Sequence, residues 1–277
     1  MSAQVWQPNF QETSPIFEPF HLMERYFTKL HHWPNLSDLE NLKAVTALPI
    51  ITCSGKPVCF VSQDNSVREW MQQYEPRIYL TGEVQTRVQN WHDFFNALVW
   101  MTFPRAKAVL NQIHFQAMLQ TCYKKETQRG PLRDAATLFD ESGVVVVCRD
   151  SKLINLLKDF EWKELFWRYR TTVLSSMKFF VFGHGLYEKA LNTYQGMTAK
   201  GIVFQVDEAY FNQSISAQLV VADELLEDFL LRGLNMTADL IPVPILGYPN
   251  WSIDNVIGTY YDNKNYFRPH PMHHNER

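Results

Sequence analysis

The chain has 277 residues, of which 46% are hydrophobic, 14% aromatic and 20% charged, and its formal net charge is −3. This composition is too apolar for a disordered chain and long enough to bury a large core, so we expect one α+β domain over residues 1–277. The weakly acidic balance lacks the positive field that nucleic acid or an anionic membrane surface selects, so neither partner is indicated.

The cysteines and the N-terminal residues indicate in which cellular compartment the protein is expected. The four cysteines are scattered and form no Cys-x-x-Cys pair, which favours reduced structural thiols over a disulfide framework or a zinc knuckle. Residues 1–20 carry two glutamates and three prolines where a signal peptide needs a basic start and an apolar run. No stretch approaches the roughly 18 consecutive apolar residues of a membrane helix. We therefore expect a cytoplasmic protein.

Residues 1–50 predict an N-terminal pair of helices. Apolar and polar residues alternate at helical spacing over residues 17–32, and Pro34 ends the run. Ser37 can cap a second helix that reaches about residue 48.

Residues 51–240 predict a helix-rich body with short strands. β-branched or aromatic runs at residues 57–61 and 77–80 lie beside glycines and predict strands, and residues 66–74 between them can form a helix. Residues 90–103 predict a strongly apolar helix, and Pro104 suits the first turn of the next one, which should reach about residue 127.

A central β-hairpin is predicted next. Residues 137–140 and 144–148 are two extended runs joined by Glu141, Ser142 and Gly143. Glycine supplies the positive φ that a tight hairpin needs, so the two runs should pair with each other.

The rest of the chain predicts helices and one strand, followed by a tail. The expected helices cover residues 151–170, 183–193 and 216–231, and the expected strand covers residues 201–206. The tail, residues 241–277, holds five prolines and many aromatic residues and should wrap the body as ordered loop. Its terminal histidines, His270, His273 and His274, form a cluster that can bind metal adventitiously.

The apolar helix of residues 90–103 carries the first candidate site residues. On a helical projection His92, Asp93 and Asn96 fall outside the broad apolar sector, in a polar sector that has no Lys or Glu. This sector is expected to face a pocket or another buried segment. The alternative is that His92 and Asn96 are core polar groups bonded to backbone.

His184 and Glu188 form the second candidate group, because the carboxylate follows the imidazole by one helical turn. A carboxylate there would fix the imidazole tautomer and raise its pKa, which suits a general base or a metal ligand. Gly183 and Gly185 permit a helix start and close approach of a ligand. The alternative is that His184 caps a turn while Glu188 pairs with a lysine.

The third group is Arg133 and Asp134, with Asp140 and Glu141 at the predicted hairpin turn. Adjacent carboxylates can bind a divalent cation or share a proton. Turns also favour aspartate for local reasons, so the structural alternative stays open.

Three blocks of the chain together resemble an uncharacterised bacterial family, domain-of-unknown-function family 3025. They are residues 90–100 (NWHDFFNALVW) with Phe-Pro-Arg at 103–105, Arg133-Asp134 with residues 138–141 (LFDE), and Phe-Gly-His at 182–184 with Glu188-Lys189. The resemblance spans residues 79–269, adding residues 246–249 (LGYP) and 267–269 (FRP). It implies a bacterial protein and brings no activity with it.

The recognisable blocks are rich in residue types that active sites use, so we expect them to converge on one polar pocket. Two functions remain in view: a hydrolase or transferase for a small anionic or phosphorylated substrate, and a non-catalytic module that binds a protein partner. In the first, His184 oriented by Glu188 is the general base, the hairpin carboxylates hold a divalent metal, and the arginines take the anionic group. The catalytic candidates are His184, Glu188, His92, Asp93, Asp140 and Glu141, and the substrate-binding candidates are Asn96, Arg105 and Arg133.

Overall fold

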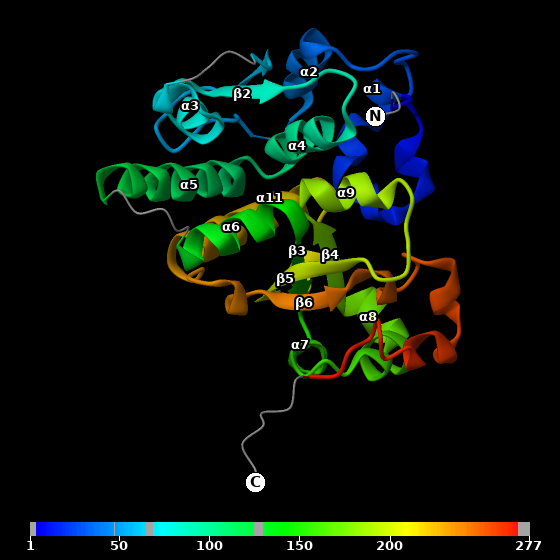
Figure 1. Cartoon of the computed structure of the whole chain (residues 1–277). Coiled ribbons are helices and arrows are strands. Elements are labelled where there is room, and N and C mark those ends of the chain that lie inside the picture. Colours follow the sequence, from blue (N-terminus) through cyan, green and yellow to red (C-terminus); the bar gives the residue numbers. More distant parts are fainter. Residues whose placement is uncertain (1–3, 47, 65–68, 125–129, 271–277) are drawn as a thin grey trace.

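The computed structural model describes residues 4–46, 48–64, 69–124 and 130–270. The chain is an α+β protein with a four-stranded and a two-stranded sheet among many helices (Figure 1). The buried hydrophobic side chains of these residues form one continuous core. Across the described ranges, no helix has both the length and the apolar character needed to cross a membrane.

The α-helices are α1 (Glu24–Phe27), α2 (Leu36–Leu42), α3 (Tyr74–Thr81), α4 (Trp91–Thr102), α5 (Pro104–Lys124), α6 (Pro131–Ser142), α7 (Ser151–Lys158), α8 (Arg170–Ser176), α9 (His184–Ala190), α10 (Glu208–Phe211) and α11 (Ile215–Arg232). The strands are β1 (Cys59–Ser62), β2 (Glu83–Thr86), β3 (Gly143–Cys148), β4 (Met177–Val181), β5 (Thr198–Gln205) and β6 (Ile241–Pro244). Short 3-10 segments are η1 (Phe10–Thr13), η2 (Pro15–Met23), η3 (Lys43–Val45), η4 (Trp70–Gln72), η6 (Thr237–Asp239), η7 (Ile245–Gly247), η8 (Ile253–Val256) and η9 (Gly258–Asp262), and η5 (Glu164–Arg168) is a π-helical turn.

The four-stranded sheet has the order β4-β3-β5-β6 and lies between two layers of helices. β3 pairs antiparallel with β4 and parallel with β5. All six β3 residues are buried, as expected of a continuous valine run that is covered on both faces. In Figure 1, α6, α9 and α11 lie above this sheet and α7 and α8 lie below it. The C-terminal end of α6 and the C-terminal end of β4, which leads into α9, therefore lie at the same edge of the sheet, next to α4.

The N-terminal helical pair is present as shorter segments than predicted. Pro19 lies inside η2, where it has no N–H to donate, and the segment is 3-10 helix followed by the single turn of α1. The expected cap at Ser37 is wrong. Asn35 caps α2 instead: its side chain accepts a hydrogen bond from the Asp38 N–H at 3.0 Å, and the Asp38 side chain accepts one from the Asn35 N–H at 2.9 Å.

The predicted strand at residues 77–80 is wrong, because these residues belong to α3. Gly82 ends this helix with φ +80°, the left-handed conformation that glycine adopts at little cost. β2, which follows, pairs in parallel with β1, so the strand predicted at residues 57–61 exists with shifted bounds. The helix predicted at residues 66–74 lies partly outside the described residues, and its described part contains η4.

The predicted central hairpin is also wrong. Residues 137–140 lie in α6, where Pro131 occupies the first turn and Ala135 and Phe139 are buried at helical spacing. Gly143 has φ −70° and so supplies no positive φ. It is small for another reason, since a Cβ there would lie 2.5 Å from the Phe139 carbonyl oxygen. α6 therefore runs directly into β3.

Later elements follow the prediction in outline. The helix expected at residues 151–170 is interrupted after α7, where Phe160 adopts φ +60°, and continues as η5 and α8. The helix expected at residues 183–193, the strand at 201–206 and the helix at 216–231 are present as α9, β5 and α11. The described part of the tail, up to residue 270, is not only loop, because β6 and three 3-10 turns lie within it.

The break between α4 and α5 at Pro104 is present as predicted, although the expected end near residue 127 lies outside the described residues. The start of α5 is capped by a residue distant in sequence. The fully buried Asp223 of α11 accepts hydrogen bonds from the backbone N–H groups of Arg105 at 3.1 Å and Ala106 at 3.0 Å. These bonds tie α5 to α11.

The burial of Asp223 predicts how the free energy of unfolding depends on pH. Burial raises its pKa to about 7, against the opposing hydrogen bonds from Ala106 and Arg105. The folded state then binds a proton that the unfolded chain releases near pH 4, so the free energy of unfolding should fall by up to about 4 kcal/mol between about pH 4 and 7. Urea unfolding at several pH values should show this slope in the wild type and a flatter one in Asp223→Asn. Equal slopes in the two proteins would contradict the assignment.

Candidate functional site

A polar cavity of about 460 Å³ opens where α4, α5, α6 and the start of α9 meet. Seven of the nine predicted site residues line it: His92, Asp93, Asn96, Arg133, Asp140, Glu141 and His184. The segments that supply them lie far apart in sequence. The structure thus gathers the recognisable blocks around one hollow.

His92 enters the cavity from the first turn of α4. Asn90 fixes the start of this helix, because its side-chain oxygen accepts a hydrogen bond from the Asp93 N–H at 3.0 Å. Trp91 and Phe94 point into the aromatic core, so His92 lies on the opposite side of the same turn. The apolar sector of α4 therefore orients the polar one.

His184 is the first residue of α9, directly after β4, and 5% of its surface is exposed. Its flanking glycines allow this turn to pack against the end of α6. A Cβ on Gly183 would lie 2.5 Å from the backbone nitrogens of Ser142 and Gly143, and one on Gly185 would lie 2.6 Å from Oε2 of Glu141. The glycines thus bring His184 next to Glu141.

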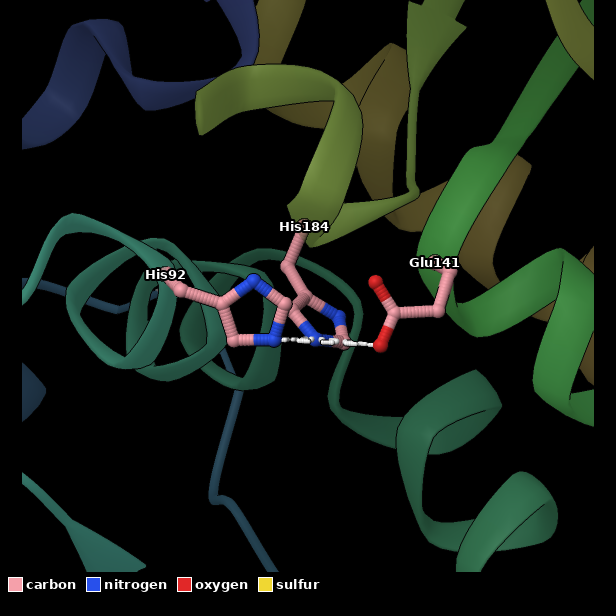
Figure 2. A group of neighbouring side chains, drawn as sticks. All are labelled: His92, Glu141 and His184. Atoms are coloured by element: carbon pink, nitrogen blue, oxygen red, sulfur yellow. Dashed lines mark hydrogen bonds and ion pairs between the residues drawn. The ribbon is translucent and has the colours of Figure 1, made fainter. Parts of the chain in front are cut away.

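Three side chains present one potential ligand atom each to a common point (Figure 2). His92 Nε2 and His184 Nε2 lie 3.0 Å apart, and Glu141 Oε1 lies 3.5 Å from His184 Nε2 and 3.7 Å from His92 Nε2. A point equidistant from three atoms at these separations is about 2.0 Å from each. Zinc bonds to imidazole nitrogen and carboxylate oxygen are about 2.0–2.2 Å long. The three residues fit a divalent metal without rearrangement.

The carboxylate of this group is held in its ionised form. The hydrogen bond with the His184 ring lowers the pKa of Glu141 below its usual range, and burial opposes this effect. The nearby His92 ring acts in the same direction as His184. An ionised carboxylate is the form that a metal ligand needs.

Glu188 orients His92 and not His184, contrary to the prediction. Glu188 Oε2 lies 3.1 Å from His92 Nδ1. With Nδ1–H donating to this carboxylate, the lone pair of Nε2 faces Glu141 and His184, as in the carboxylate–histidine–metal arrangement of known sites. The helical spacing of His184 and Glu188 gave the wrong partner because His92 comes from another helix.

We expect Glu188→Gln to weaken zinc binding by roughly 10–100-fold, because the neutral amide no longer polarises the His92 ring. Competition with a chromophoric chelator measures the zinc dissociation constant. Glu164→Gln is the matched control, since Glu164 pairs with Arg168 on the surface, away from the cavity. Equal zinc affinity in Glu188→Gln and the control would show that Glu188 does not support the site.

Behind His184 lies a buried charged network. Asp140 Oδ2 is 3.9 Å from His184 Nδ1, and this nitrogen is buried with no hydrogen bond to any described residue. Asp140 Oδ1 accepts a hydrogen bond from Lys107 Nζ at 2.6 Å. Burial, the largest single effect, would raise the pKa of Asp140, but the Lys107 charge, the His184 ring and the hydrogen bond from Lys107 together hold the pKa below its usual range. Asp140 therefore stays negative beside the His184 ring.

Asn96 completes this network from α4. Its Oδ1 accepts a hydrogen bond from Lys107 Nζ at 2.9 Å, and its Nδ2 donates one to the Tyr74 hydroxyl at 2.8 Å. Each of the two alternatives expected for the polar face of α4 describes one of its residues. Asn96 is a buried polar group with hydrogen-bond partners, whereas His92 faces the cavity next to His184.

Asp93 and the arginines take different places. Asp93 lines the cavity but binds Arg87 through two side-chain hydrogen bonds, of 2.7 and 3.0 Å. Arg133 lines the cavity from α6. Arg105 does not line it, and its guanidinium lies 2.9 Å from Glu224 on α11. Arg105 was expected in the site because it belongs to the same recognisable block as His92, but it lies at the start of α5 and pairs with α11 instead.

The prediction from sequence missed several residues of the cavity wall, chiefly His114 and Arg87. It also missed Lys107, which bonds the lining residues Asn96 and Asp140. Lys107 is 4% exposed, although lysine on a helix normally lies in solvent. Its apolar neighbours Ala106, Ala108 and Val109 were the only available indication of burial. Lys107, Asn111 and His114 follow one another at helical spacing, which marks a polar stripe on α5.

A comparison with protein-family models matches residues 58–271 to the family described as "Protein of unknown function (DUF3025)". This range contains all nine predicted site residues. No curated protein and no solved structure matches the chain.

Proposed function

Because the chain belongs to the DUF3025 family, whose description assigns no activity, we propose from the geometry of the site that the protein is a metal-dependent hydrolase of small phosphorylated molecules. The observation that carries this proposal is the triangle of His92 Nε2, His184 Nε2 and Glu141 Oε1, open on one side to the cavity. Two histidines and one carboxylate, with a free fourth position, are the ligand set of catalytic zinc sites. The same proposal includes a cytoplasmic location in a bacterium.

The chain's own residues prepare this site. Glu188 fixes the ring of His92, the ionised Asp140 lies behind the ring of His184, and Glu141 supplies the negative charge. A divalent ion bound by these residues would polarise a phosphoryl oxygen and lower the pKa of a water molecule at its open position.

The charge balance supports a phosphorylated substrate. Lys107 neutralises Asp140, and Arg87 neutralises Asp93. Among the described lining residues this leaves Glu75 and Glu141 against Arg133. A divalent ion changes the sum of these charges from −1 to +1, so the loaded cavity attracts anions. Arg133 adds a guanidinium to the wall of this cavity, where it can form charge-assisted hydrogen bonds with an anionic group of the substrate.

Metal analysis and a hydrolysis assay test the proposal. Protein reloaded with zinc or manganese should release phosphate from a panel of sugar phosphates, nucleotides and p-nitrophenyl phosphate, and protein treated with a chelator should not. Glu141→Gln changes one ligand oxygen to an amide with little change of shape and should remove both metal and activity. Stoichiometric metal without turnover on any ester would contradict the hydrolase and support the non-catalytic module.

A further inference from the structure

The geometry points to a second anion subsite in the same cavity, formed by Arg133 and His114, and we infer that the substrate carries two anionic groups roughly 10 Å apart. The inference rests on the proposed function, because the other anionic group belongs at the metal. It names the substrate class: small molecules phosphorylated at both ends.

The position of the subsite follows from the packing of α5 against α6. The two helices lie side by side and run in opposite directions in Figure 1. Lys107 on α5 bonds Asp140 on α6, which fixes one level of the pair. His114 lies seven residues after Lys107, and Arg133 seven residues before Asp140. Seven residues are about two helical turns, so both side chains lie at one second level, about 10 Å away.

Both residues line the cavity and offer cationic or hydrogen-bonding groups to it. Within the described residues, the side chain of neither Arg133 nor His114 takes part in a hydrogen bond or ion pair with another residue. This distinguishes Arg133 from Arg87, which Asp93 engages, and from Arg105, which Glu224 engages. His114 is 6% exposed, so its ring is held by packing and its polar edge can reach only the cavity.

The spacing separates this subsite from the metal ligands. Glu141 follows Asp140 directly, so the candidate metal lies at the level of the Lys107–Asp140 pair. A single phosphate bound at the metal cannot also contact the Arg133 guanidinium, which lies about two helical turns away. A molecule with a phosphate at each end can contact both, and the cavity of about 460 Å³ holds one of that size.

Binding of alkane-α,ω-bisphosphonates tests the inference without any chemical step, because their carbon–phosphorus bonds are not hydrolysed. Calorimetric titration of the zinc-loaded protein should show affinity that rises with chain length between two and eight carbons. Once the chain spans both subsites, the bisphosphonate should bind at least about tenfold tighter than the monophosphonate of equal length. The monophosphonates correct for the apolar contribution of the chain.

Arg133→Gln should lose this tenfold preference while keeping its zinc content, and His114→Gln should reduce it. Arg105→Gln is the matched control, since it removes an arginine of the same helix pair that lies outside the cavity, and it should behave as the wild type. A wild-type affinity that does not depend on chain length, or a preference that survives in Arg133→Gln, overturns the subsite. If the length dependence is present and no ester is hydrolysed, the subsite stands and the proposed hydrolase fails.

Discussion

Replacing His184 by alanine should remove stoichiometric metal binding and, with it, hydrolysis. The ring supplies one of three ligand atoms, and the remaining two cannot surround an ion. Altering a residue that merely orients a ligand costs roughly 10–100-fold in metal affinity, so loss of a ligand should cost more than about a hundredfold. Elemental analysis after dialysis, followed by zinc titration, measures the change.

The terminal histidines are the main source of error in this experiment. His270, His273 and His274 can bind zinc on their own, so the titration is done in a background where all three are alanine. In that background the wild-type site should bind one zinc per chain and His184→Ala none at micromolar protein. One zinc per chain in both would show that the metal binds elsewhere.

A melting comparison separates a ligand from a structural histidine. Within the described residues the hydrogen bonds of the His184 ring are those of its Nε2, with His92 and with Glu141, so the metal-free variant should lose only about 1–3 kcal/mol of unfolding free energy. Zinc at a hundred times its dissociation constant should stabilise the wild type by about 2.7 kcal/mol and leave the variant unchanged. A large loss of stability without metal would assign His184 to the core.

Replacing Lys107 by methionine should destabilise the protein by about 3–5 kcal/mol. The change keeps the length of the side chain but leaves the Asp140 carboxylate without its partner in a site where both groups are largely buried. Urea unfolding measures the change. The double variant Lys107→Met/Asp140→Leu should recover part of the loss, because no uncompensated charge remains.

An exposed ion pair provides the comparison. Lys163 lies 2.6 Å from Asp262, the same separation as between Lys107 and Asp140, but both partners are solvent-accessible. Lys163→Met should therefore cost no more than about 1 kcal/mol. If Lys107→Met is as mild as this control, Asp140 is not held by its lysine, and its position behind His184 has another cause.

The sequence predicted the elements whose local pattern and long-range packing agree. α4 and α11 have apolar periodicity at helical spacing and are present near the expected bounds, and α5 begins at Pro104 as predicted. The prediction failed for residues 77–80 and 137–140, where short runs resemble strands but continue helical patterns that begin at Tyr74 and Pro131. In both cases the glycine that follows was interpreted as a strand or hairpin signal, whereas it ends a helix.

Seven of the residues that line the candidate cavity were named from the sequence, but which of them contact one another was not predicted. His92, Glu141 and His184 were named from three separate blocks, and the cavity brings them together. The partners of Glu188 and of Asp140 could not be predicted, since they lie on α4 and α5 and depend on how these helices pack. Spacing along one helix predicts neighbours on that helix only.

The direct passage of α6 into β3 has a consequence for hydrogen exchange around the candidate metal site. Glu141 lies two residues before the innermost strand, whose amide protons should exchange with deuterated solvent only through global unfolding. His92 and His184, in contrast, each occupy the opening turn of a helix, where amides are released by local fraying. Bound metal should therefore slow exchange in β3 by the full stabilisation that it gives the fold. At the starts of α4 and α9 it should slow exchange by suppressing the fraying that carries the two imidazoles away from the carboxylate.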